Sequence, residues 1–277
     1  MMSNAPIGLF DSGIGGLTVV QEVFRQLPQE EILYFGDTLR CPYGDRDKNE
    51  IIRFSTEIGD FLVNRGVKLL IIACNTATAT SLSILQQRYD IPVIGVISPG
   101  SRAAISMSKT MRVGVIGTRV TVASDAYAKE IHRLNPKLYV VSQACPEFVP
   151  IVENDRIETE ASKRIVARDL ASISTENIDT LILGCTHYPL LKHVIQDVMG
   201  SRVQLINSAE ETAREASTIL SIKNLLNERR SEKRHKFFVS ANVDTFRMIG
   251  ERWLGRKLDV ELVDLFNSNQ PRTFRVI

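Results

Sequence analysis

The sequence predicts an α/β protein whose mostly parallel sheets are covered by helices on both faces. Short apolar runs rich in β-branched residues alternate with longer amphipathic segments through most of the 277 residues. Near-continuous apolar strands separated by helices are typical of buried parallel sheets. At roughly 150 residues per domain, a chain of this length corresponds to about two domains.

The expected elements follow from these two patterns. Apolar, β-rich runs predict strands over residues 7–11, 32–37, 69–74, 93–97, 113–118, 138–142, 181–185, 203–207 and 237–241. Between them, apolar residues at helical spacing predict helices. These helices are expected over residues 16–27, 50–65, 76–89, 122–134, 159–173 and 210–228.

A weak internal similarity supports two similar domains that face each other. Residues 68–76 (KLLIIACNT) and 180–187 (TLILGCTH) both read as a strand that ends in cysteine and continues into polar side chains. The two cysteines lie 111 residues apart, which is too far for a solenoid repeat. Any two buried strands would share the apolar part, but not the matched cysteine endings.

Composition excludes several classes of protein. Apolar residues make up 44% and charged residues 24%, as in globular domains, and the net charge of +2 is too small to indicate a nucleic-acid partner. The longest charge-free window of note, residues 69–87, carries eight polar side chains, so no membrane span is expected. The N-terminus lacks a basic segment, which argues against a signal peptide. The segment 228–236 carries five Lys or Arg and two Glu, and we interpret it as a solvated connection.

Cysteine usage predicts a cytoplasmic protein with free thiols. The four cysteines, Cys41, Cys74, Cys145 and Cys185, are too few for a disulfide framework, and neither CxxC nor HExxH occurs. Some of these thiols can have a chemical role, whereas others are only buried.

Polar clusters directly follow four of the expected strands. They are residues 11–13 (DSG), 36–37 leading to 42–44 (PYG), 74–76 (CNT) and 185–187 (CTH). Ligands of open α/β sheets bind outside the carboxyl ends of the strands, where helix N-termini supply free N–H groups. The glycine-rich turn at residues 13–16 has neither GxGxxG nor a P-loop lysine, so a structural turn and an anion-binding turn both remain open.

Cys74 and Cys185 are the strongest chemical signal. Each lies at a strand end next to a helix N-terminus, a position expected to lower the pKa of a thiol. His187 follows Cys185 by two residues, and Asp11 ends a strand at the same edge. Cys41 and Cys145 lack this context, and we expect them to have packing or surface roles.

Three interpretations of the two thiols remain open from the residues alone. Cys74, Cys185 and His187 could bind zinc, although no fourth ligand is evident. A Cys185–His187 pair could hydrolyse an amide, which leaves Cys74 without a role. Two bases on opposite sides of one carbon would use both cysteines, one as thiolate and the other as thiol.

Five stretches of the sequence resemble the glutamate racemases, the cofactor-independent members of the aspartate/glutamate racemase superfamily. They are residues 10–19 (FDSGIGGLTV), 34–45 (YFGDTLRCPYGD), 73–79 (ACNTATA), 149–153 (VPIVE) and 184–191 (GCTHYPLL), in the order of that family. The resemblance implies two pseudo-symmetric open-sheet domains with the active site between them. One comprises residues 1–97 plus 208–277 and carries Cys74, and the other comprises residues 98–207 and carries Cys185.

The resemblance also implies a reaction and its residues. Glutamate would be interconverted between its L and D forms without a cofactor or metal, supplying D-glutamate for peptidoglycan. Cys185 would act on L-glutamate and Cys74 on D-glutamate, with Asp11 assisting Cys74, and His187 with Glu153 assisting Cys185. The implied substrate-binding residues are Asp11, Ser12, Tyr43, Gly44, Asn75, Thr76, Thr118, Thr121, Thr186 and His187.

Other functions stay open at this point. An aspartate or hydantoin racemase would use the same pair of thiols, and a Cys–His amidohydrolase would tolerate the loss of Cys74. We expect a homodimer, because twofold dimers are the commonest oligomers. We expect neither a nucleic-acid nor a membrane partner.

Overall fold

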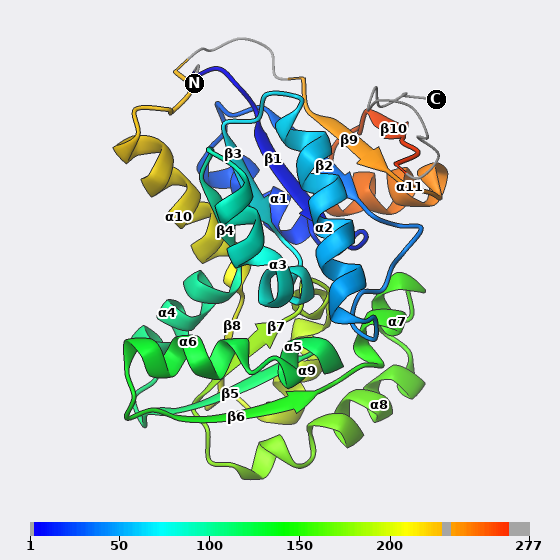
Figure 1. Cartoon of the computed structure of the whole chain (residues 1–277). Coiled ribbons are helices and arrows are strands. Elements are labelled where there is room, and N and C mark those ends of the chain that lie inside the picture. The colour runs from blue at the N-terminus through cyan, green and yellow to red at the C-terminus, as the bar shows by residue number, and fades with distance from the viewer. Residues whose placement is uncertain (1–2, 229–233, 266–277) are drawn as a thin grey trace.

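The computed structural model describes residues 3–228 and 234–265, and in that part of the chain two parallel sheets form the framework. The first sheet has the order β10-β9-β2-β1-β3-β4 and the second β6-β5-β7-β8. Figure 1 shows the first sheet above the second. All neighbouring strands are parallel, which confirms the predicted α/β class.

The strands agree closely with those expected, apart from one at an edge. The first sheet contains β1 (Ile7–Asp11), β2 (Ile32–Gly36), β3 (Leu69–Ile72), β4 (Val93–Gly95), β9 (Lys236–Val239) and β10 (Val260–Leu262). The second contains β5 (Arg112–Gly117), β6 (Tyr139–Ala144), β7 (Thr180–Gly184) and β8 (Gln204–Ile206). The sequence did not predict β10, a strand of three residues at the edge of the first sheet.

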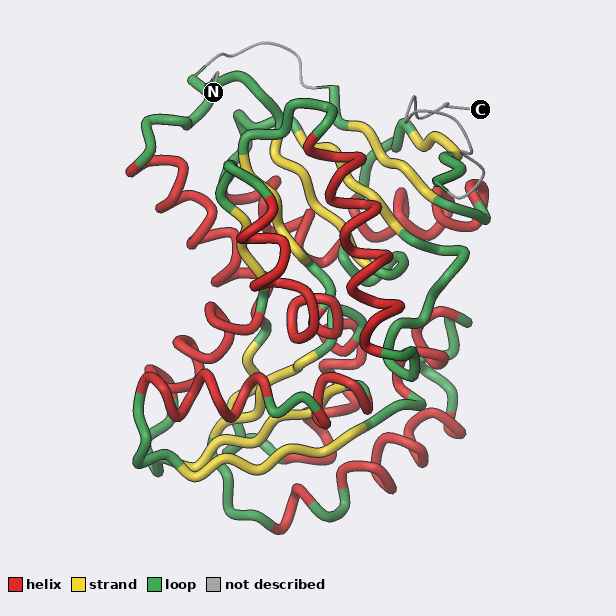
Figure 2. Tube along the Cα trace, in the orientation of Figure 1, coloured by secondary structure: helices red, strands yellow, loops and turns green. Residues whose placement is uncertain are grey.

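Helices cover both faces of each sheet (Figure 2). Those predicted in outline are α1 (Leu17–Gln26), α2 (Lys48–Val63), α3 (Asn75–Arg88), α5 (Arg119–Ala123), α6 (Ala126–Leu134), α8 (Glu160–Leu170) and α10 (Ser208–Ile222). Those not predicted are α4 (Ile97–Met107), α7 (Phe148–Glu153), α9 (Lys192–Met199) and α11 (Val243–Leu254), with 3-10 turns η1 (Ile173–Thr175) and η2 (Tyr188–Leu191). None of the described helices is long and apolar enough to cross a bilayer.

Two predicted helices were wrong in extent. The one expected over residues 122–134 is split into α5 and α6, because Asp125 has a positive φ of 58° that interrupts the helical backbone. The one expected to reach residue 228 ends at Ile222, and Asn224 beyond it also has a positive φ, 52°. Of the charged segment 228–236, residues 229–233 lie outside the described part of the chain.

Alternation along β1 shows how one strand serves two cores. Leu9 packs on one face with residues of α1, α10 and α11, whereas Phe10 packs on the other with residues of α2 and α3. The second sheet has the same construction, with α7, α8 and α9 on one face and α4 and α6 on the other. Because every strand is parallel, the polar residues that follow the strands gather at one edge of each sheet.

Candidate active site

The carboxyl ends of β1 and β7 meet across the two sheets. Asp11 is the last residue of β1, and Thr186 lies two residues beyond the end of β7. The Thr186 hydroxyl donates a hydrogen bond of 3.1 Å to Asp11 Oδ2, and both residues are buried. The polar cluster of the first sheet therefore contacts that of the second directly.

Cys74 lies in this contact zone as the N-cap of α3. Its sulfur accepts a hydrogen bond from the Ala77 backbone N–H at 3.5 Å and lies 3.9 Å from Ser12 Oγ. The residue is only 5% exposed. Cys74 therefore lies between the end of β3 and the N-terminus of α3, as the sequence predicted.

The predicted lowering of the thiol pKa is wrong for Cys74. Burial raises the pKa of Cys74 most, followed by the charge of Asp11, and the pKa reaches about 12 although the hydrogen bond from the Ala77 N–H lowers it. Burial removes the water that would solvate a thiolate. This desolvation raises the pKa of Cys74 more than the N-terminus of α3 lowers it. Without a ligand, Cys74 is therefore a thiol at neutral pH.

Cys185 heads a short relay that ends in a carboxylate. Its sulfur lies 3.6 Å from His187 Nδ1, and His187 Nε2 lies 2.6 Å from Glu153 Oε1. Burial alone would lower the pKa of His187, but its hydrogen bonds to Cys185 and Glu153 raise that pKa well above its ordinary value. Burial opposes ionisation of Glu153 too, yet the hydrogen bond and charge of His187 lower the pKa of this carboxyl. These two pKa directions mean that His187 is protonated and is paired with an ionised Glu153.

Asp11 interacts with both halves of the site. Burial raises its pKa, while the charge of His187 and hydrogen bonds from Gly13 and Thr186 lower it in part. The Gly13 N–H donates to Asp11 Oδ1 over 3.0 Å. In this turn a Cβ at Gly15 would lie 2.5 Å from Thr186 Oγ1 and 2.6 Å from the His187 ring, so glycine is required for the close approach of the two sheets.

Three threonine hydroxyls form a second polar cluster. Thr76 Oγ1 lies 2.9 Å from Thr118 Oγ1 and 3.2 Å from Thr121 Oγ1, and the latter two are 3.0 Å apart. Thr76 belongs to α3, Thr118 follows β5 and caps α5, and Thr121 lies within α5. The structure therefore brings together three predicted substrate-binding residues from both sheets.

Asn75 offers a buried donor beside Cys74. The side chain is 2% exposed, and its Oδ1 accepts a hydrogen bond of 2.6 Å from the Tyr127 hydroxyl. Its Nδ2 has no hydrogen-bond partner among the described residues. Since buried N–H groups are nearly always paired, this amide is suited to an acceptor such as a carboxylate oxygen.

The loop after β2 places Tyr43 and Gly44 against the same region. The Tyr43 hydroxyl donates to Asp37, so this hydroxyl is already occupied. The Gly44 carbonyl accepts a hydrogen bond of 3.1 Å from the Val120 N–H. A Cβ at Gly44 would lie 2.8 Å from Thr118 Cβ, which shows how closely the loop approaches the threonine cluster.

Sequence reasoning missed Cys41 and Tyr127. The Cys41 thiol lies 3.8 Å from Glu153 Oε1, at the end of the relay, although a packing or surface role was expected. Its place between Asp37 and Tyr43, inside a polar cluster, was the available signal. Tyr127 had no such signal, because it lies within an amphipathic helix and its ring belongs to an apolar core cluster. Cys145 is buried in the second core, in agreement with a packing role.

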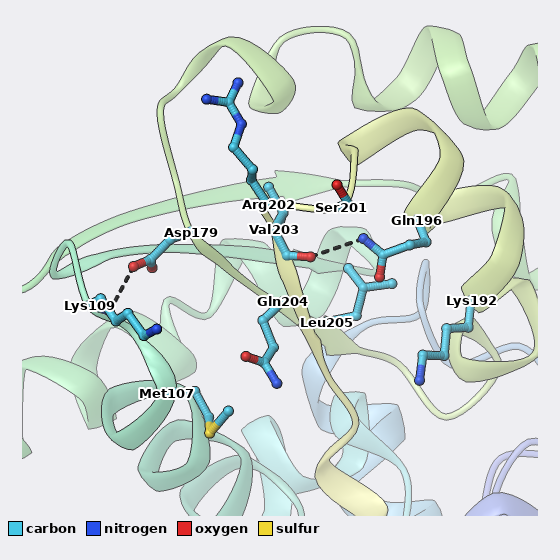
Figure 3. Close-up of a pocket in the computed structure, with 10 residues that line it drawn as sticks. All are labelled: Met107, Lys109, Asp179, Lys192, Gln196, Ser201, Arg202, Val203, Gln204 and Leu205. Atoms are coloured by element: carbon cyan, nitrogen blue, oxygen red, sulfur yellow. Dashed lines mark hydrogen bonds between the residues drawn. The ribbon is translucent and has the colours of Figure 1, made fainter.

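Two cavities differ in the chemistry of their linings. A small one of about 70 Å³ adjoins the relay and is lined by Gly13, Cys41, Glu153 and residues of α11. A larger one of about 350 Å³ follows the edge strand β8 and is lined by Lys109, Asp179, Lys192 and Gln204 among others (Figure 3). It contains no cysteine or histidine, so its lining offers no thiol or imidazole chemistry. No group of three or more His, Cys, Asp or Glu side chains is arranged to hold a metal within the described ranges.

Comparison with known proteins agrees with this geometry. The family model for Asp/Glu/Hydantoin racemase matches residues 7–216. The chain is 48% identical over 272 residues to the glutamate racemase of Lactococcus lactis subsp. cremoris (strain SK11), covering 98% of this chain and 100% of the relative.

Solved structures give the same result. Glutamate racemase isoform RacE1 from Bacillus anthracis is 48% identical with a TM-score of 0.92, covering 95% of this chain and 98% of the other. The glutamate racemase of Francisella tularensis subsp. tularensis SCHU S4, solved in complex with D-glutamate, is 37% identical with a TM-score of 0.90, covering 95% and 99%. With its fold, its converging cysteine-bearing strand ends and these matches, the chain belongs to the Asp/Glu/Hydantoin racemase family.

Proposed function

We propose that this chain interconverts L-glutamate and D-glutamate, with Cys74 and Cys185 as bases on opposite faces of the α-carbon. The observation that carries this proposal is the 3.1 Å hydrogen bond between Asp11 and Thr186, because it joins the strand end beside Cys74 to the residue after Cys185. The charge of a thiolate at Cys185 also contributes to the raised pKa of Cys74, as expected for two neighbouring sulfurs.

In the L-to-D direction, Cys185 as thiolate takes the α-proton and Cys74 as thiol supplies a proton. The C–H bond breaks and its electron pair stays on the α-carbon while a new S–H bond forms at Cys185. The S–H bond of Cys74 then breaks, and a C–H bond forms on the opposite face. The two sulfurs finish with exchanged protonation states, so the reverse reaction begins from Cys74 as thiolate.

The protonation states of the ligand-free site suit L-glutamate as the first substrate. Burial keeps Cys74 protonated, ready to deliver a proton. His187 is protonated and lies beside the Cys185 sulfur, where its positive charge attracts a thiolate, and Glu153 holds the imidazole in place. For D-glutamate, Cys74 must first lose its proton, and Asp11 is the carboxylate whose charge raises the pKa of Cys74.

The negative charge that develops on the substrate is stabilised by hydrogen-bond donors that are neutral or positively charged. The Asn75 amide and the hydroxyls of Thr76, Thr118 and Thr121 supply such donors in a water-excluded site. Preorganised donors of this kind stabilise carbanion-like charge at low reorganisation cost. Asp11 and Glu153 are already hydrogen-bonded to Thr186 and His187, which fits assistance to the thiols better than contact with an anionic substrate.

We further propose domains of residues 1–97 plus 208–277 and of residues 98–207. The first sheet takes its strands from residues 7–95 and 236–262, and the second takes its strands from residues 112–206, which supports this division. We also propose that the chain is a cytoplasmic homodimer that supplies D-glutamate for peptidoglycan. Four free cysteines fit a reducing compartment, and sedimentation analysis tests the dimer.

The deciding experiment incubates the chain with L-glutamate in deuterated water without added cofactor. We expect optical rotation to decay to zero and the α-position to become deuterated at a similar rate. Ammonia release from glutamine without loss of rotation would instead favour the amidohydrolase, and faster turnover of aspartate would favour an aspartate racemase. Retention of both rotation and α-hydrogen would overturn the proposal.

A further inference from the structure

We propose that Tyr127 is a positioning residue that holds the Asn75 amide with its N–H groups directed toward a substrate carboxylate. This inference rests on the proposed function and adds a residue from outside the cysteine-bearing motifs. Tyr127 belongs to α6 of the second sheet's layer, whereas Asn75 begins α3 of the first.

The Tyr127 side chain spans the two cysteine-bearing segments. Its ring lies against Gly184, the residue before Cys185, since a Cβ at Gly184 would be 3.1 Å from Tyr127 Cε2. Its hydroxyl donates to Oδ1 of Asn75, the residue after Cys74, over 2.6 Å. Tyr127 is 2% exposed, so neither contact competes with water.

The orientation of an amide depends on which of its ends is bound. A carboxamide has an acceptor oxygen and a donor NH₂, and rotation by 180° exchanges them. The Tyr127 hydroxyl has one hydrogen, and Ser208 at the start of α10 lies beside its oxygen, where it favours the ionised phenol as a donor does. The phenolic hydrogen is thereby left for Asn75 Oδ1, and the Nδ2 donors face away from Tyr127.

The unpaired Nδ2 atom shows why this orientation matters. A buried N–H without an acceptor is costly, and native proteins retain few such groups. Burial raises the pKa of Tyr127, so the phenol stays a neutral donor across the physiological range. Without its hydroxyl, the amide is free to turn its oxygen toward the substrate, where it would repel a carboxylate.

The test replaces Tyr127 with Phe, which removes only the hydroxyl. We expect the KM for glutamate to rise about tenfold, as for loss of a hydrogen bond to a charged group, with kcat changed less than about threefold. Because the enantiomers have equal free energy, kcat/KM must fall by the same factor in both directions. Tyr89→Phe is the matched control, since it removes a hydroxyl bound to Asp60 at 2.9 Å between α2 and α3; its KM should not change.

A double-mutant cycle separates positioning from general damage to the fold. In an Asn75→Ala background, Tyr127→Phe should raise KM by less than twofold further, because the amide that it orients is absent. A full tenfold effect in that background, or an unchanged KM in the single variant, would overturn the proposal. Should Tyr127→Phe fail to fold, Ser208→Ala removes the second contact of the hydroxyl, and it should raise KM severalfold; an unchanged KM there would count against the proposal.

Binding distinguishes this inference from the proposed function. Racemic glutamate, whose composition a racemase leaves unchanged, is titrated into the wild-type chain and the Tyr127→Phe variant, and Kd is expected to rise about tenfold. If the wild-type chain binds glutamate without racemising it, the proposed function fails and the ratio of the two Kd values still decides the role of Tyr127. If the wild-type chain does not bind glutamate, both fail.

Discussion

Thr186 and Asp11 are joined by a 3.1 Å hydrogen bond although 175 residues separate them in the chain. Each lies next to a group with a proposed role in proton transfer: Thr186 follows Cys185, and Asp11 raises the pKa of Cys74. Two half-sites that belong to different sheets are thereby fixed at one distance from each other. The following predictions test what each half contributes.

Replacing either sulfur base should abolish racemisation but leave one-sided hydrogen exchange. For Cys185→Ser and Cys74→Ser we expect turnover to fall by about 10²–10⁴-fold or more, the usual contribution of a general base. In deuterated water, Cys185→Ser should still exchange the α-hydrogen of D-glutamate, and Cys74→Ser that of L-glutamate. Cys145→Ser, in the second core, is the control. Near-normal turnover of Cys185→Ser in both directions would rule out two bases.

Loss of His187 should affect proton removal from L-glutamate more than from D-glutamate. His187 contacts Cys185 at 3.6 Å, and His187→Ala removes the positive charge beside the sulfur that acts as thiolate on L-glutamate. Because kcat/KM must stay equal in both directions, the measurement is the primary deuterium isotope effect with each α-deuterated enantiomer. We expect a larger isotope effect for the L enantiomer. Equal isotope effects for both enantiomers would contradict the assignment of His187 to one face of the substrate.

The pair of Glu153 and His187 should give stability a defined pH window. The lowered pKa of Glu153 means that its contribution is lost as pH falls below about 4.5, and the raised pKa of His187 means that its contribution persists through pH 6.5 and is lost only well above it. We expect Glu153→Gln to reduce the unfolding free energy at pH 6 by about 1–2 kcal/mol, a low value because Glu153 is partly exposed.

Denaturant unfolding at several pH values measures this window, and NMR titration of the His187 ring measures the accompanying fall in its pKa. Glu130→Gln is a control for the His187 titration, because it removes a carboxylate that is paired with Arg133 and not with His187. The assignment fails if the stability difference between Glu153→Gln and the wild-type chain is the same at pH 4 and pH 6.

A methyl group at Gly15 should damage the site rather than the fold alone. The added Cβ would lie 2.6 Å from the His187 ring, so the ring or the turn has to move. We expect Gly15→Ala to lose at least about 1–3 kcal/mol of stability, as in overpacked cores, and to lower kcat strongly. Gly66→Ala is the matched control: its positive φ makes alanine unfavourable, yet nothing lies within 4 Å, so stability should fall while kcat stays normal. Equal kcat for both variants would refute the contact argument.

The sequence predicted the framework well because its signals are local. Nine strands and the class of sheet follow from apolar runs, and the strand-end position of Cys74 follows from the edge rule for parallel sheets. The helices α7 and α9 were missed, since six to eight residues are fewer than the window over which helical periodicity is read, and the strand β10 and the helices α4 and α11 were missed as well.

Long-range packing set the properties that the sequence did not predict. The pKa of Cys74 depends on burial and on Asp11, which outweigh the local helix N-terminus. The approach of Cys41 to Glu153 joins residues 112 positions apart, and the bond from Tyr127 to Asn75 joins residues 52 positions apart. No pattern along a single segment encodes such contacts.

The chain crosses between its sheets twice, through α4 and through the step from β8 to α10, and these helices touch where Gly100 meets Ser208. Because each sulfur is anchored to its own sheet, the gap between the bases depends on how the two sheets are held together at this crossing and at the Asp11–Thr186 bond. The turnover rate is therefore expected to depend on the angle between the two sheets. Substitutions in the Arg102–Glu215 ion pair, which links α4 to α10 and contacts no catalytic group, would alter the rate by resetting that angle.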